Sequence, residues 1–293
     1  MMGILECRPL LCSPEVDRFM NVMLRSRISR RVIAEQYLSL TEAFNSLWHF
    51  PDSKVGLESH SDSIGEVFLH CNAQQVVRSC FDQILKLARQ VYGPRQTLPA
   101  LRIQGHLTAT FPYILTHLQY IIGELLRNSI QALVGNSGQS PPQAIEVLIC
   151  EAPQHVILRF SDQGGGIAPE LMPSIWSFAK GSRSQVYLDN LSRVPKLAAT
   201  MQELKMPDAD VPGAGGRDDR EVSSDASLSS FTARPPNLRL GMGLPISRLY
   251  SEFYAGSLEL HNLDGYGVDA FLQISKLGNQ NEQLTTRTSI DSV

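Results

Sequence analysis

A run of three glycines directly after an apolar strand pattern sets the strongest constraint on how this chain can fold. Val156–Ser161 reads VILRFS, a short run of branched and aromatic residues that predicts a β-strand, and Asp162 follows it. Gly164, Gly165 and Gly166 come next. Glycine tolerates backbone conformations that are closed to other residues, so a ligand can approach the chain closely here. We therefore expect a carboxylate at the end of a sheet strand, although a glycine cluster after a strand is by itself most often just a turn.

The composition is that of a folded protein with room for two modest domains. The chain has 293 residues, of which 43% are hydrophobic. Its net charge of -3 provides no chain-wide basic field, so neither nucleic acid nor an anionic membrane surface is indicated as the main partner. No apolar run is long enough to span a bilayer. The five cysteines form no C-x-x-C pair and follow no secretory signal, which favours reduced thiols inside a cell and argues against a structural zinc.

The first 100 residues are predicted to form a helical docking domain. Val16–Phe44 has long apolar side chains at helical spacing. Asn72 then precedes a second amphipathic run as a helix-capping residue, with Gln75 three positions later, and Gly93 ends the run. Such helices are typical of a bundle, which either packs as a scaffold or docks on a partner. The N-terminal MMGILECRPLLCS contains Glu6 and too little positive charge for a mitochondrial targeting segment.

From residue 101 to 277 the pattern becomes mixed, which predicts an α+β domain. Arg183–Asn237 is rich in Ser, Gly, Pro and Asp and is predicted to be a long mobile loop, while residues 278–293 form a polar tail. The other expected elements are a helix over about Tyr113–Leu133, strands over Ala144–Cys150 and Val156–Ser161, a helix from Gly243 to Gly256, and a strand pair over Ser257–Leu263 and Val268–Lys276.

The stretch ELLRNSIQAL, residues 124–133, places a carboxylate and an amide beside the apolar face of a helix. Successive helical residues turn by about 100°, so Glu124 and Asn128 lie about 40° apart, with Gln131 on the same stripe. Such a pair lies at the edge of the core and can face a pocket. Alone, such a pair is more often a solvated helix flank than part of a functional site.

The stretch GMGLP, residues 241–245, opens the next helix. Gly241 and Gly243 precede Pro245, which lies in the first turn, where proline is favoured. Backbone N–H groups at such a start can bind a phosphate. The earlier Asp162 could accept a hydrogen bond from the exocyclic amine of adenine. Neither motif is specific alone, but all three occur in the order E-x-x-x-N, D-x-G-x-G, loop, G-x-G-L-P.

This joint order resembles the N, G1 and G2 boxes of the GHKL superfamily of ATPases and kinases. The chain has neither a Walker A motif nor the H-R-D and D-F-G motifs of the common protein kinases. RSRISRRVIAEQYLSL, GHLTATFPYILTHLQYIIGELLRNSIQAL, SDQGGGI and GLPISRLYSEFYAGSLELHNLDGYGVDAFLQI resemble the mitochondrial 2-oxoacid dehydrogenase kinases, which act on pyruvate or branched-chain complexes. The resemblance covers about Val16 to Leu277. It implies an N-terminal helical bundle followed by a Bergerat-type α/β sandwich that binds ATP.

The resemblance also implies an activity and partners. The expected protein is a serine/threonine kinase that uses ATP and Mg²⁺, phosphorylates the E1 component of the complex and thereby inactivates it. Its N-terminal domain would dock on the lipoyl-bearing E2 component. The family is found in the mitochondrial matrix and forms homodimers through the C-terminal sheets.

Site residues follow from the same resemblance. Glu124 matches the general base that accepts the proton of the attacking serine, Asn128 matches the magnesium ligand, and Asp162 matches the carboxylate that binds adenine. Gly181 and Ser182 fall where contacts on the lid side are expected. The full set of expected nucleotide contacts is Glu124, Leu125, Asn128, Gln131, Asp162, Gly164, Gly166, Gly181, Ser182, Arg239, Leu240, Gly241, Met242, Gly243 and Leu244.

Three departures from the family pattern stand out. Tyr120 replaces the histidine that pyruvate dehydrogenase kinases have one helical turn before Glu124, as in the branched-chain enzyme. Arg239 replaces the first glycine of the G2 box, and arginine adopts glycine-type backbone angles only at a cost. The N-terminal domain is also short for the family.

Three functions therefore stay open. An active 2-oxoacid dehydrogenase kinase is the leading interpretation. A nucleotide-binding pseudokinase that docks on the same complex is favoured by Arg239 and the short N-terminal domain. A two-component histidine kinase is disfavoured, because no histidine lies in a recognisable dimerisation helix with an acidic residue after it.

Overall fold

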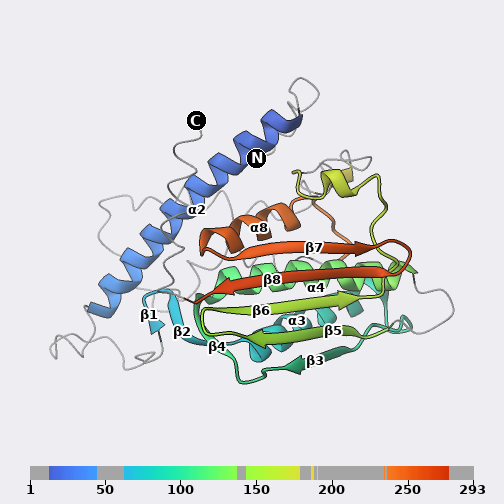
Figure 1. Ribbon diagram of the computed structural model, residues 1–293, viewed down its shortest axis with the longest axis horizontal. Coiled ribbons are helices and arrows are strands. Elements are labelled where there is room, and N and C mark those ends of the chain that lie inside the picture. Colours follow the sequence, from blue (N-terminus) through green and yellow to red (C-terminus); the bar gives the residue numbers. More distant parts are fainter. Residues whose placement is uncertain are drawn as a thin grey trace, which may run out of the picture.

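A mixed five-stranded sheet forms the centre of the structure from residue 101 onward (Figure 1). The computed structural model describes residues 13–44, 63–136, 143–178, 186–187, 190, 234 and 236–276. The strand order is β3-β5-β6-β8-β7, with β3 parallel to β5 and the other pairs antiparallel. The strands are β3 (Leu101–Gly105), β5 (Ile145–Glu151), β6 (His155–Asp162), β7 (Ser257–Leu263) and β8 (Gly267–Ser275).

Helices cover one face of this sheet. They are α3 (Ala73–Tyr92), α4 (Leu115–Asn136) and α8 (Gly243–Phe253), and Figure 1 shows α3 and α4 behind the strands. Along β6 the buried side chains alternate with half-buried ones, and Asp162 belongs to the buried set with Phe160. Because alternate residues of a strand point to the same face, the carboxylate faces the helix layer.

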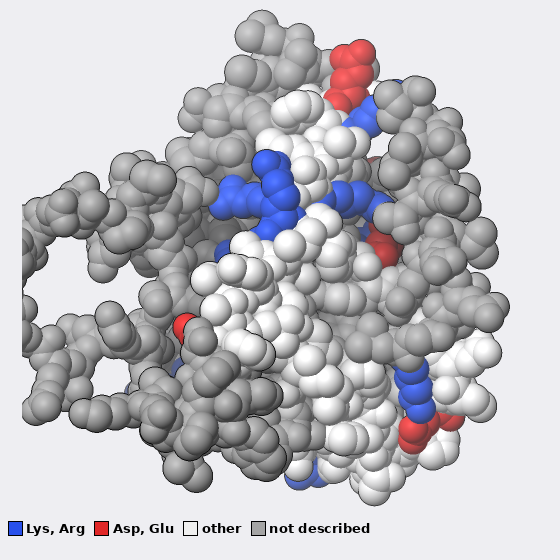
Figure 2. Space-filling model, turned by 90° about the vertical axis from the view of Figure 1, so that its left-hand side faces the viewer, with Lys and Arg blue, Asp and Glu red and all other residues white. Residues whose placement is uncertain are grey.

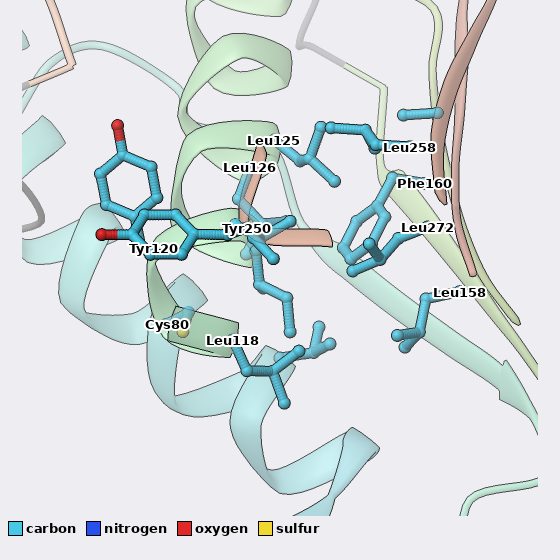
Figure 3. Close-up of a cluster of buried hydrophobic side chains, with 14 of the residues drawn as sticks. Cys80, Leu118, Tyr120, Leu125, Leu126, Leu158, Phe160, Tyr250, Leu258 and Leu272 are labelled. Carbon is cyan, nitrogen blue, oxygen red and sulfur yellow. The ribbon is translucent and has the colours of Figure 1, made fainter. Parts of the chain in front are cut away.

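The main core lies between α4 and the sheet. Figure 3 shows Leu118 and Leu125 of α4 on the side that faces Leu158, Phe160 and Leu272 of the sheet. All five side chains are almost fully buried. Their burial fixes the rotation of α4 about its axis, and therefore fixes which polar residues of that helix face the site.

A long helix and a small second sheet lie outside this layer. The helix is α2 (Ser13–Phe44), which contacts α8, and its Asp17 accepts a hydrogen bond of 3.1 Å from the N–H of Phe178. The second sheet is antiparallel and has the order β1-β2-β4. Its strands are β1 (Ser63–Ile64), β2 (Val67–Asn72) and β4 (Thr110–Ile114).

Most of the elements predicted from the sequence are present. The predicted α+β class is confirmed: an N-terminal helix precedes a domain in which helices cover one face of a mixed sheet. The predicted cap of α3 is also confirmed, because Oδ1 of Asn72 accepts a 2.9 Å hydrogen bond from the N–H of Gln75, and Gly93 follows the last turn. The strand pair β7 and β8 turns at Asp264 and Gly265 as expected. The division into domains at residue 100 stays a prediction.

Two predictions about the first half of the chain were wrong. Tyr113 belongs to β4 and not to the following helix, which begins at Leu115 and continues to Asn136. The region before residue 115 also contains β1, β2, β3 and β4, none of which was predicted. These strands are short, and they pair with segments far away in the chain, so the local sequence carries little signal for them.

Parts of the other predictions lie outside the described residues. These parts are the polar tail from residue 278 and almost all of the loop from 183 to 237. Within the described part of the chain, none of the helices combines the length and apolar character that crossing a membrane requires. Figure 2 shows one face of the molecule, where several Lys and Arg side chains gather in a small group amid uncharged surface and others lie apart from it.

Candidate functional site

A cavity of about 560 Å³ lies between α4, the end of β6 and the segment that leads into α8. It brings together every predicted site residue that the structure describes. These are Glu124, Leu125, Asn128, Gln131, Asp162, Gly164, Gly166, Arg239, Leu240, Gly241, Met242, Gly243 and Leu244. Gly181 and Ser182 lie outside the described residues. Segments more than 100 residues apart thus line one volume, as an ordered set of site motifs requires.

Asp162 forms one end of the cavity. Its Oδ2 accepts a 2.8 Å hydrogen bond from the hydroxyl of Ser129 on α4, and its Oδ1 accepts a 3.0 Å bond from the N–H of Gly164. Burial raises the pKa of Asp162, and these two hydrogen bonds, with one from the backbone of Val268, lower it in part. A carboxylate oxygen can accept more than one hydrogen bond, so both oxygens can still bind a ligand donor.

The glycines after Asp162 are required by close packing and by backbone conformation. A Cβ on Gly164 would lie 2.4 Å from the Cβ of Ala132 on α4. Gly166 has a φ of +79°, a backbone conformation that residues other than glycine rarely adopt. The carbonyl of Gly164 also accepts a 2.6 Å hydrogen bond from the amide of Asn136. The turn is therefore fixed against α4, which keeps its backbone beside the Asp162 carboxylate.

The opposite end of the cavity is the N-terminus of α8. Gly241 has a φ of +65°, and the helix begins at Gly243, directly after Met242. The first N–H groups of a helix have no acceptor within the helix, and the helix dipole makes this end positive. The arrangement is suited to bind a phosphate group.

Glu124 lies at this end of the cavity, beside Gly243, and is almost fully buried, with 1% of its surface exposed. Its Oε1 accepts a 2.5 Å bond from Nη1 of Arg127, and its Oε2 accepts a 2.6 Å bond from Nη2 of Arg234. Both arginines are buried too. Glu124 is therefore deeper than the edge position predicted from the helix pattern, and both of its oxygens are engaged by guanidinium groups.

Two of the three departures from the family pattern, Arg239 and Tyr120, are accommodated without backbone strain. Arg239 has no positive φ, and among the described residues other than glycine only Ala255 does. The loop therefore does not require glycine at position 239. Tyr120 is buried, its ring centroid lies 5.5 Å from that of Tyr250, and both side chains lie on the side of α4 away from the sheet (Figure 3). Burial raises the pKa of Tyr120 far above its ordinary value, so this side chain stays neutral.

Asn128 has the properties of a ligand for a hard cation. Its side chain is exposed and lines the cavity one helical turn from Glu124. Magnesium takes oxygen ligands, and it commonly uses only one or two protein ligands, with phosphates and water completing its shell. The amide oxygen of Asn128 fits this role. Within the described residues, no group of three or more His, Cys, Asp or Glu side chains could hold a metal by itself.

Reasoning from the sequence missed four residues of the site. Arg127 and Ser129 lie within the predicted helix, and the i, i+3 spacing of Arg127 from Glu124 is a usable signal. Asn136 had no such signal. Arg234 lies in the segment rich in Ser, Gly, Pro and Asp, where nothing in the local sequence points to an ion pair with a residue 110 positions earlier.

Comparisons with known proteins agree with this geometry. Residues 114–277 match the family described as histidine kinase-, DNA gyrase B- and HSP90-like ATPase. Residues 1–68 match the family described as mitochondrial branched-chain alpha-ketoacid dehydrogenase kinase.

Curated relatives cover nearly the whole chain at modest identity. The mitochondrial [pyruvate dehydrogenase (acetyl-transferring)] kinase 2 of Saccharomyces cerevisiae is 26% identical over 97% of this chain and 62% of its own length. The mitochondrial [pyruvate dehydrogenase (acetyl-transferring)] kinase of Arabidopsis thaliana is 27% identical over 92% of this chain and 60% of its own length. The human kinase isozyme 4 is 25% identical over 89% of this chain and 52% of its own length. The chain thus spans less than two thirds of these relatives.

The match over residues 114–277 includes all three boxes of the cavity and more than half of the chain. The expected resemblance to the mitochondrial 2-oxoacid dehydrogenase kinases is confirmed by the second match and by the relatives. The chain belongs to the histidine kinase-, DNA gyrase B- and HSP90-like ATPase family.

Proposed function

We propose that this protein is an ATP-dependent protein kinase that phosphorylates a serine of the E1 component of a mitochondrial 2-oxoacid dehydrogenase complex. One observation carries the proposal: Glu124, Asn128, Asp162 and the Gly241–Gly243 loop line a single cavity. Phosphoryl transfer depends mainly on positioning and on neutralising charge, and this cavity supplies groups for both.

The nucleotide would lie along α4. Asp162 would accept a hydrogen bond from the adenine amine, and the fixed turn at Gly164 would let the ring approach the backbone. The N-terminus of α8 would bind the phosphates. Asn128 would hold Mg²⁺, which supplies positive charge to the phosphate oxygens when it is bound. The other residues named from the sequence, including Gly181 and Ser182, stay predicted contacts.

Glu124 would act as the general base toward the serine hydroxyl. Its carboxylate lies directly against Gly243 of the phosphate loop, so it is close to where a terminal phosphate would lie. Arg127 and Arg234 fix its position and balance its charge. Such a base must be within hydrogen-bond reach of the attacking hydroxyl.

The proposed partners follow from the relatives and from the surface of α2. The relatives are named as pyruvate dehydrogenase kinases, while the first 68 residues match the branched-chain family, so both complexes are candidate substrates. Large apolar side chains are exposed along α2, among them Phe19, Val22, Ile33, Tyr37 and Leu38. This surface supports docking on the lipoyl-bearing E2. Location in the mitochondrial matrix and homodimer formation belong to the same proposal.

The decisive experiment is phosphate transfer from labelled ATP to purified pyruvate and branched-chain complexes. We expect one E1 to be labelled on serine by the natural chain, and this labelling to be lost in Glu124→Gln. Glu146→Gln is the matched control, because that carboxylate is exposed on β5 and forms only a long pair with Arg102, at 3.8 Å. Labelling of Glu124→Gln at the natural rate would contradict the role of the base, and acid-labile label would indicate a histidine kinase.

A second function is favoured by the two arginines on Glu124. Both oxygens of Glu124 already accept hydrogen bonds from guanidinium groups, so a serine hydroxyl would have to compete with Arg127 and Arg234 for the carboxylate. A pseudokinase that binds ATP and docks on the complex without phosphotransfer is therefore the alternative. Binding of ATP with no labelling of either E1 would support it.

A further inference from the structure

We propose that Arg234 binds the terminal phosphate of the nucleotide, and that Glu124 binds its guanidinium when no triphosphate is present; this rests on the proposed function. Arg234 is thus a positioning and specificity residue that distinguishes a triphosphate from a diphosphate. Nothing in the motif pattern of the sequence assigned it a role.

The location of Arg234 is the first argument. Its Nη2 lies 2.6 Å from Oε2 of Glu124, and an ideal Cβ on Gly243 would lie 2.0 Å from that same oxygen. The guanidinium therefore lies beside the first residue of α8, where the phosphate chain is expected. Arg234 also lines the cavity directly.

The hydrogen bonding of Arg234 is the second argument. The residue is 7% exposed, and its Nε is buried without an acceptor among the residues that the structure describes. A guanidinium offers five N–H donors in a planar fork that matches the geometry of phosphate oxygens. A buried donor without a partner destabilises a protein, and a phosphate oxygen would remove that cost.

The opposing role of Glu124 is the third argument. The carboxylate of Glu124 and a phosphate are both anions that a guanidinium binds well, so they compete for the N–H donors of Arg234. With a triphosphate in the cavity, part of the Arg234 hydrogen bonding would pass from Glu124 to the phosphate. A diphosphate would be too short to make this contact, and Arg234 would stay on Glu124.

The test compares affinities for a non-hydrolysable ATP analogue and for ADP, each with Mg²⁺, by calorimetry on the full chain. In Arg234→Gln we expect affinity for the analogue to fall about tenfold or more, and affinity for ADP to change less than about twofold. Arg159→Gln is the matched control, because Arg159 of β6 also has a buried Nε with no acceptor among the described residues, but does not line the cavity. It should change neither affinity.

Two further variants make the outcome decisive. Glu124→Gln should improve binding of the analogue relative to ADP, because the competing carboxylate is gone. Arg234→Lys keeps the positive charge without the planar guanidinium, so it should retain part of the preference for the ATP analogue over ADP. This variant also replaces Arg234→Gln if Arg234→Gln does not fold. The proposal would be overturned if a variant of Arg234 lost affinity equally for the analogue and for ADP, or if neither variant of Arg234 changed either affinity. Absence of any nucleotide binding by the natural chain would overturn the proposed function as well.

Discussion

The Oε2 atom of Glu124 occupies the space into which a side chain at Gly243 would project, since an ideal Cβ there would lie only 2.0 Å from it. The glycine of the phosphate loop and the buried carboxylate of α4 thus depend on one another. Arg127 and Arg234 hold the carboxylate in place, so it cannot simply move aside.

Gly243→Ala is therefore expected to destabilise the protein and to abolish phosphotransfer. Overpacking of a core typically lowers the free energy of unfolding by about 1–3 kcal/mol. Denaturant titration measures this loss. Gly135→Ala is the control: it lies near the end of the same helix α4, its added Cβ would meet no atom within 4 Å, and it should be neutral or slightly stabilising. Equal stability of Gly243→Ala and the natural chain would show that Glu124 is not held firmly.

Nucleotide binding should weaken in mild acid because of Asp162. Its pKa lies above the ordinary 3.8, chiefly because of burial. Protonation removes the charged acceptor that is proposed to bind adenine, so ADP affinity should fall as the pH falls through the raised pKa, at a higher pH than for an exposed aspartate. Calorimetric titration with ADP at several pH values measures this. Asp162→Asn should bind weakly at every pH, and a pH profile shared by both proteins would contradict the assignment.

Protonation of Asp162 should have the opposite effect on stability: its contribution to the free energy of unfolding should rise as the pH falls. The folded protein binds this proton more tightly than the unfolded chain does. The contribution of Asp162 to the free energy of unfolding is therefore fully present below 3.8 and is lost as the pH rises through the raised pKa. The difference in stability between Asp162→Asn and the natural chain should change over that window, which denaturation at a series of pH values will test.

His117 should make the protein sensitive to acid. It is 1% exposed, and its ring lies 4.4 Å from that of Tyr250. Burial, assisted by the charge of Arg31, lowers the pKa of His117 from 6.5 to about 3. The pKa of His117 is lower in the folded protein than in the unfolded chain, so its contribution to the free energy of unfolding is fully present above pH 6.5. This contribution is lost as the pH falls toward 3, by about 1.4 kcal/mol per pH unit.

His117→Phe keeps an aromatic ring against Tyr250 and removes the titrating group. We expect the free energy of unfolding of this variant to depend less on pH between 6.5 and 3 than that of the natural chain. If the two proteins lose stability in parallel over this range, other groups cause the sensitivity.

Asn72→Ala should cost about 1 kcal/mol of stability, the usual effect of losing an N-cap. The side chain accepts a 2.9 Å bond from the N–H of Gln75 at the start of α3. Asn72→Asp is the matched control, since a carboxylate caps the helix equally well. Thermal or denaturant unfolding of both variants will separate the cap from general effects at this position.

Local signals explain which features the sequence could predict. The cap at Asn72, the turn at Gly265 and the strand end at Asp162 each depend on residues within a few positions, and all three were predicted correctly. The last two residues of β4, Tyr113 and Ile114, were assigned to the following helix. An aromatic and a branched residue match a buried helix as well as a strand, and pairing with distant β2 decides between the two.

Some features of the candidate site could likewise be predicted from local motifs, and others could not. Its ordered motifs predicted the cavity-lining residues, because each motif carries a recognisable local chemistry. The ion pair between Arg234 and Glu124 joins positions 110 apart, and no periodicity or spacing encodes it. The depth of Glu124 follows from this pair, since a carboxylate is buried at low cost only when cations accompany it.

The helix α4 also fixes the distance between the two ends of the cavity. It carries Glu124 at the phosphate end, Ser129 bound to Asp162, and Asn136 bound to the turn at Gly164. The rise from Glu124 to Ser129 is about 7.5 Å along the axis and cannot change without breaking the helix. A molecule that touches both ends must therefore have the right length, because neither end can slide toward the other. We therefore expect this cavity to select its ligand by length, through the fixed rise of a single helix.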